Sequence, residues 1–114
     1  GIGKLLESLS ADGRDKLSVF LEKGQSRYKI HFLLADEARQ INTISGEGWF
    51  RRQVNSANGI WAGNGFADQY LLKPANHSRS LYQEVGEEFG YVLNRGRHTL
   101  VKLVTVKREE EDGE

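Results

Sequence analysis

The chain of 114 residues contains no cysteine, no methionine and a single proline. Without cysteine it cannot form a disulfide, a thiolate nucleophile or a sulfur-ligated zinc site. Long apolar runs are also missing, since no stretch approaches the roughly 20 residues that a membrane-spanning helix needs. The first residues lack the order of charged, apolar and small residues that marks a signal peptide. These absences predict a cytoplasmic protein whose segment makes no membrane contact.

Charges of the two signs balance, with 16 Lys and Arg against 16 Asp and Glu, but they are unevenly distributed. Acidic residues dominate 107–114, which predicts a disordered, solubilising tail. The other 106 residues carry 14 basic and 11 acidic side chains. Residues 89–106 contain no acid, and their positive field suits a phosphate-bearing partner, although an ordinary solvated strand face explains it equally well. The basic and titratable residues in this range are Arg95, Arg97, His98 and Lys102.

The length favours one core, because a chain of this size buries too little surface for two. We therefore expect a single α/β domain over residues 1–106. Apolar residues at helical spacing predict two short helices, or one kinked helix, interrupted at Asp12-Gly13 and ending at Gly24. Further along, Trp49, Phe50 and Val54 predict a third helix.

A strand is expected from Lys29 to Ala35, where the sequence is Lys-Ile-His-Phe-Leu-Leu-Ala. This run is too continuously apolar for a sheet with one wet face, so it predicts a central parallel strand covered on both sides. Asp36 and Glu37 follow directly after its carboxyl end. Ligands of open α/β sheets bind outside the carboxyl ends of strands, so we interpret these two acids as candidate catalytic residues.

In the second half of the chain, residues typical of turns separate short segments that are typical of strands. Two Asn-Gly steps, at Asn58 and Asn64, bracket a short strand over residues 60–63. Two β-rich runs, 91–93 and 99–106, predict a C-terminal hairpin whose basic tip is formed by residues 94–98. The fold class is therefore α/β, with a sheet in the middle layer, helices on both faces and a C-terminal hairpin.

Short motifs give limited support for chemistry. Gly1-Ile2-Gly3-Lys4 is similar to the end of a phosphate-binding loop, but Leu5 stands where that loop needs Ser or Thr. Residues 32–37 have the pattern of a Walker B strand, in which Asp36 would hold magnesium and Glu37 would activate water. An acidic turn after a core strand explains the same pattern without chemistry. The three histidines show no metal-ligand spacing, so no metal site is predicted.

One ordered set of features resembles a known family, the C-terminal part of the motor domain in FtsK/SpoIIIE-type DNA translocases and their relatives in type VII secretion. The family's strand Gly-Ile-His-Phe/Leu-Val-Leu-Ala matches residues 28–36, and its basic helix matches 49–58. The next short strand matches 59–63, and the Gly-Arg-Gly-like turn between closing strands matches 90–97. The resemblance covers roughly residues 17–106.

The resemblance implies a RecA-like ATPase lobe that uses ATP and magnesium, oligomerises and works on DNA or a protein substrate. It places Asp36 where the family usually has an uncharged polar residue that senses the γ-phosphate, and a carboxylate there would repel the triphosphate. Arg51 and Arg52 would contact a phosphate or a neighbouring subunit. Arg95 and Arg97 would approach nucleotide or DNA. Because the chain has no Walker A motif, it would need the remainder of a larger motor.

Two other hypotheses remain open. In the first, the chain is a non-catalytic α/β binding module that holds nucleic acid or another anionic partner with its basic hairpin. In the second, it is a small enzyme that uses Asp36 and Glu37 with a metal ion.

Overall fold

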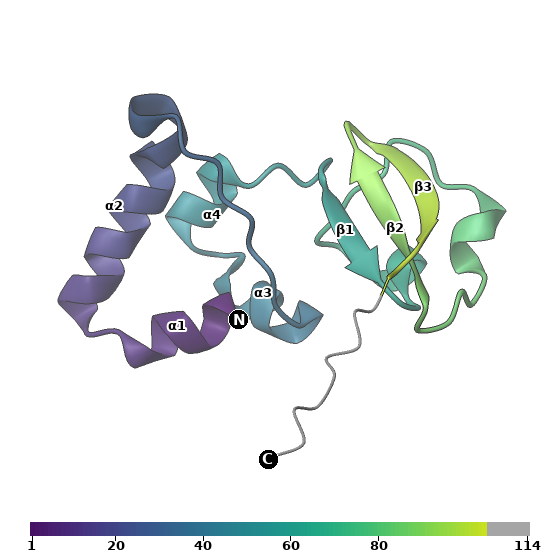
Figure 1. Ribbon diagram of the computed structural model, residues 1–114, viewed down its shortest axis with the longest axis horizontal. Helices are drawn as coiled ribbons and strands as arrows, with labels where there is room; N and C mark the ends of the chain where they lie inside the picture. The colour runs from purple at the N-terminus through teal and green to yellow at the C-terminus, as the bar shows by residue number, and fades with distance from the viewer. Residues whose placement is uncertain (105–114) are drawn as a thin grey trace, which may run out of the picture. The chain divides into compact units, whose positions relative to one another are not determined.

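The computed structural model describes residues 1–104 and shows a protein of mixed helix and strand, as expected. The chain forms two compact units, Gly1–Ser56 and Ala57–Glu114, and each is described here by itself (Figure 1). The single domain expected over residues 1–106 stays a prediction, and the tail expected at 107–114 lies outside the described residues. Within the described range, every helix is too short or too polar to cross a membrane.

The first unit is built from four α-helices around a small apolar core. They are α1 (Ile2–Ser8), α2 (Ala11–Tyr28), α3 (Ala38–Ile44) and α4 (Gly48–Gln53). Each helix contributes one buried side chain to the core, namely Leu6, Leu21, Ile44 and Trp49. The polar stretch before Trp49 was not expected to be helical, yet it forms α3 because Ile41 and Ile44 lie on one helical face and pack on this core.

Helix α2 corrects two predicted boundaries. The interruption between the first two helices lies at Leu9-Ser10 and not at Asp12-Gly13. Ser10 is the N-cap of α2, because its hydroxyl accepts a hydrogen bond from the Gly13 N–H. The helix also continues past Gly24 to Tyr28. Gly24 is buried because the ring of Phe32 packs where its side chain would be, with Phe32 Cε2 2.5 Å from an added Cβ. The residue that ends α2 is Lys29, which adopts the left-handed conformation at φ 55°.

The predicted central parallel strand over residues 29–35 is wrong for the described chain. Residues 29–37 have no regular secondary structure and connect α2 to α3 as a plain tube in Figure 1. A strand exists only when a neighbouring strand completes its hydrogen bonds, and the first unit contains none within the described residues. The sheet that is described is antiparallel, and the three-layer arrangement is not seen.

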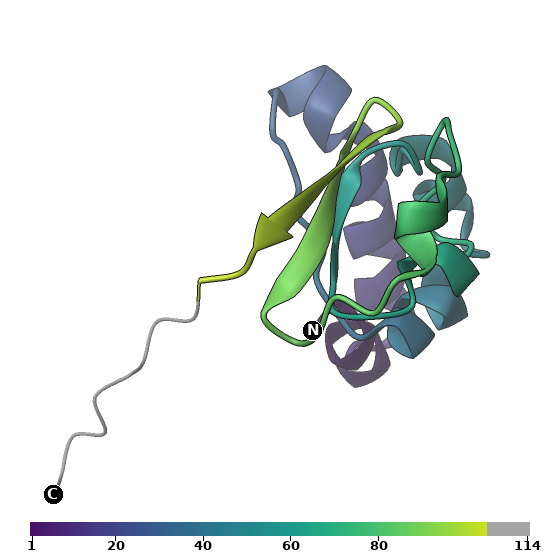
Figure 2. The same ribbon diagram turned by 90° about the vertical axis from the view of Figure 1, so that its right-hand side faces the viewer.

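The second unit is a three-stranded antiparallel sheet in the order β1-β2-β3, with β1 Gly59–Ala62, β2 Phe89–Asn94 and β3 Arg97–Lys102. The 3-10 helices η1 (Phe66–Asp68) and η2 (Arg79–Tyr82) belong to the connection between β1 and β2. In Figure 2, η2 lies on one side of the sheet. On that side Phe66 and Leu81 pack against Tyr91 and Leu93 to form a second core.

The expected C-terminal hairpin is confirmed, and its turn is tighter than predicted. Asn94 pairs with Arg97, so only Arg95 and Gly96 lie between the strands. Both have positive φ, 51° and 82°, as a two-residue hairpin turn of type I′ requires. The short strand expected over residues 60–63 is also confirmed as β1. The last residues of the expected second hairpin strand, 105–106, lie outside the described range.

Candidate functional site

Asp36 lies at the end of the irregular segment and holds the start of α1. Its Oδ2 accepts a hydrogen bond from the Gly3 N–H at 2.8 Å, and its Oδ1 accepts one from the Glu37 N–H at 2.8 Å. Gly3 is buried, and a side chain there would approach Gln40 and the Asp36 carboxylate. The glycine that resembled part of a phosphate loop therefore allows close approach of a carboxylate instead.

The same two hydrogen bonds lower the pKa of Asp36 from its ordinary 3.8, with the Gly3 N–H contributing most and the Glu37 N–H next. Both bonds favour the ionised carboxylate, and they outweigh partial burial, which acts in the opposite direction. At neutral pH the group is a carboxylate whose two oxygens are both engaged. It acts in the described structure as a structural cap.

Acid is expected to weaken the first unit through Asp36. Because the pKa is lower in the folded state than in the unfolded state, this group stabilises the fold above about pH 4. That contribution is lost as the pH falls through the folded-state value. Thermal unfolding followed by helical circular dichroism from pH 7 to pH 2 should show this loss, and D36N should lower the midpoint at pH 7 and flatten the acid limb.

Asp15 provides the control for that experiment. Its side chain is exposed and makes no hydrogen bond or ion pair within residues 1–104. D15N removes the same charge, so it should leave the acid limb unchanged. An acid limb that is equally steep in D36N and in the wild type would show that Asp36 does not contribute.

Within the described residues, no side-chain ion pair joins Arg51 or Arg52 to Asp36, and Glu37 contacts it only through its backbone N–H. Glu37 precedes α3 and pairs with Arg39 at 3.2 Å, with both side chains largely exposed. Arg52 pairs with Glu22 of α2 and so ties α4 to that helix. Arg51 is exposed in the last turn of α4. Surface ion pairs of this kind contribute little to stability. The described residues include no cluster of three or more His, Asp or Glu that could hold a metal ion.

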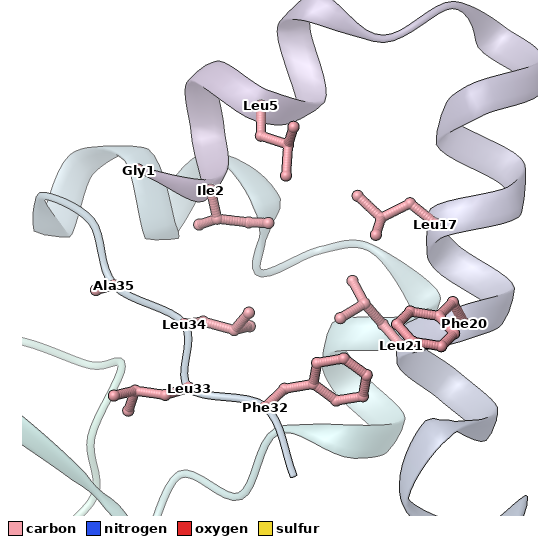
Figure 3. A pocket seen from close by; sticks show the side chains of 10 residues that line it. All are labelled: Gly1, Ile2, Leu5, Leu17, Phe20, Leu21, Phe32, Leu33, Leu34 and Ala35. Atoms are coloured by element: carbon pink, nitrogen blue, oxygen red, sulfur yellow. The ribbon is translucent and has the colours of Figure 1, made fainter. Parts of the chain in front are cut away.

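A groove of about 390 Å³ runs between α1, α2 and the irregular segment, and its lining is apolar (Figure 3). Phe32 and Leu34 point into the groove toward the two helices, whereas Leu33 points away. Phe32 meets the ring of Phe20 edge-on at 5.3 Å between centroids. Leu34 packs on the core of the unit, and Leu33 is 90% exposed. This alternation is the geometry of an extended strand with one face covered.

The predicted basic residues of the second unit occupy the hairpin turn. Arg95 is one of its two central residues, and Arg97 begins β3; both side chains are exposed. The Arg95 N–H donates to Asn58 Oδ1 at 2.8 Å, and the Gly96 N–H donates to the Ala57 carbonyl at 3.0 Å. The sequence pattern did not reveal these anchors, because they come from the chain before β1.

No protein-family model matches the chain, and neither the curated proteins nor the solved structures yield a match.

Proposed function

We propose that the chain is the C-terminal lobe of an FtsK/SpoIIIE-like, RecA-type translocase that is driven by ATP and lacks a Walker A motif of its own. The family resemblance over residues 17–106 suggests this function. The observation that supports it best is the condition of residues 30–35, an apolar segment that is extended and largely exposed, and in which residues 31–34 make no backbone hydrogen bond within residues 1–104.

The backbone of this segment is available for pairing. Within residues 1–104, the N–H and C=O groups of residues 31–34 make no hydrogen bond, and the Ala35 carbonyl accepts one from Ile2 at 3.4 Å. Apolar side chains are costly to expose to water, and a continuous apolar run is typical of a strand in a parallel sheet. We infer that residues 30–35 become a sheet strand when the rest of the motor supplies its neighbours.

The helices already present fit one layer of such a sheet. Leu34 and Phe32 point toward α1 and α2, while the opposite side, with Leu33, is bare. Parallel sheets of α/β proteins carry helices on both faces, so a second layer would cover Leu33. This is the three-layer arrangement that the family resemblance implies.

Nucleotide chemistry needs residues beyond those described. Asp36 lies at the carboxyl end of the segment, where a nucleotide would be expected, but both of its carboxylate oxygens are engaged by N–H groups. The described residues hold no metal cluster and no phosphate loop. They do not fit ATP and magnesium by themselves, and a homo-oligomer or the remainder of the motor would have to provide that site.

ATP hydrolysis tests the proposal. The chain alone is expected to show no turnover, whereas the complete product of its open reading frame is expected to hydrolyse ATP faster when its DNA or protein substrate is added. L33K in that product should abolish the stimulated rate, because a lysine on the inner face of the sheet would be buried without a partner. V104K is the control. Hydrolysis by the isolated chain, or no nucleotide binding by the complete product, would contradict the proposal.

A further inference from the structure

The structure brings a second segment beside the hairpin turn. The Ala75 N–H donates to the Gly96 carbonyl at 2.9 Å, and Ser78 Oγ lies 3.5 Å from His98 Nε2. The loop over residues 69–83 therefore runs next to the end of the β2–β3 hairpin. We call residues 69–83 together with 94–98 the basic surface.

The basic surface holds four cationic side chains and no carboxylate. All four are exposed, and none of them forms an ion pair within the described residues. Among residues 57–104, the acids lie before and after the loop in the sequence, at Asp68, Glu84, Glu87 and Glu88. Positive charge without local neutralisation is the electrostatic footprint of a phosphate-binding surface. The four cations are Lys73, Arg79, Arg95 and Arg97.

The turn that carries two of these cations is fixed before any partner arrives. Asn58 and Ala57 hold the backbone of Arg95 and Gly96 from one side, and Ala75 holds Gly96 from the other. A side chain at position 96 would lie 3.0 Å from Ala75 Cβ, so glycine is needed for this contact as well as for the positive φ. A turn that is already fixed loses little backbone entropy on binding, which favours its affinity for a chain of phosphate groups.

Two tyrosines of the loop add exposed aromatic rings to the basic surface. Tyr70 is 88% exposed and Tyr82 is 66% exposed, although large aromatic side chains ordinarily gain by burial. Exposed aromatic rings among arginines match single-stranded nucleic acid, whose bases stack on rings while its phosphates meet the cations. An acidic protein surface would use the cations but has no need of the rings.

We propose that the basic surface binds single-stranded nucleic acid, with Arg95 and Arg97 on the phosphates and Tyr82 stacking on a base. This inference does not depend on the proposed ATPase lobe, because it concerns only the second unit and binding is measured without ATP. A failure to bind single-stranded nucleic acid would not change the expected ATP hydrolysis, and a failure to hydrolyse ATP would not change the expected binding.

Fluorescence anisotropy with a labelled oligothymidylate of about 20 nucleotides tests the proposal on the full chain. Binding should weaken steeply with salt. R95Q/R97Q should weaken it about tenfold at low salt and reduce the slope of log K against log[salt] by about 1.4, which corresponds to two phosphate contacts. The matched variant K23Q/R27Q removes the same charge from α2 and should leave the slope unchanged, since both residues belong to the first unit.

Tyr82 separates nucleic acid from other anions. Y82L should weaken oligothymidylate binding about fivefold or more, as expected for the loss of one stacked base, while leaving the salt slope unchanged. Circular dichroism confirms that each variant is folded. The proposal is overturned if the wild type does not bind at low salt, if polyglutamate binds as tightly, or if a duplex of the same length binds more tightly than the single strand.

Discussion

Replacing Gly90 by alanine is expected to separate β1 from β2 and destabilise the second unit by about 3 kcal/mol, the upper part of the range for overpacking. Gly90 is buried in the middle strand and pairs with Ala62 of β1 and Val101 of β3. A Cβ at this position would overlap the carbonyl oxygen of Trp61 and lie 3.2 Å from Cα of Ala62. Those atoms are backbone, so no side-chain rotation relieves the contact.

Urea unfolding followed by tryptophan fluorescence measures this effect, because Trp61 of β1 packs against the core of the second unit. Hydrogen exchange should show the amides of β1 losing protection in G90A first. G46A is the matched control, since Gly46 has open space around its Cα. If G90A unfolded at the same urea concentration as the wild type, β1 would not pair with β2 in the described register.

The hairpin could be predicted because its determinants are local. Gly96 accepts the positive φ that the second central residue of the turn requires, and β-rich runs flank the turn on both sides. The strand β1 followed from the same reasoning, because Asn-Gly steps bracket it. Where a few adjacent residues decide the structure, the sequence pattern was sufficient.

The segment 29–37 shows where such reasoning stops. Its apolar run fits a buried strand, but a strand also needs partners that its own residues do not specify. Gly24 was interpreted as a helix end for a related reason. A glycine that follows a basic residue is typical of a C-terminus, yet the close approach of Phe32, eight positions away in the sequence, is what requires glycine at this site.

In the candidate site, too, local features could be predicted from the sequence, whereas contacts between distant residues could not. The position of Asp36 after an apolar segment could be predicted, whereas its partner Gly3, 33 positions earlier, could not. Likewise the basic tip of the hairpin could be predicted, but not the loop over residues 69–83 that lies beside it. Loops are brought together by long-range contacts such as the one between Ala75 and Gly96. The periodicity of apolar residues in the sequence does not predict such contacts.

Exposure of residues 30–35 has a consequence for the chain in solution. An apolar segment with free backbone groups is a template for pairing with another copy, so we expect the isolated chain to self-associate as its concentration rises. L33K should suppress this association, raising the concentration at which it occurs roughly tenfold or more, equivalent to at least ~1.4 kcal/mol. Light scattering coupled to size-exclusion chromatography provides the measurement.

Val104 offers a closely matched control for that substitution. It is an aliphatic residue in the second unit with 88% exposure, against 90% for Leu33, so V104K adds the same charge and removes a similar apolar surface. If both variants suppressed association equally, general solubility would be the cause. If L33K alone does so, the edge over residues 30–35 is the pairing surface, and the same edge is then available to the neighbouring strands of a larger motor. A chain that stays monomeric at high concentration would contradict this view of the segment, because water would then be satisfying its backbone without a strong drive to pair.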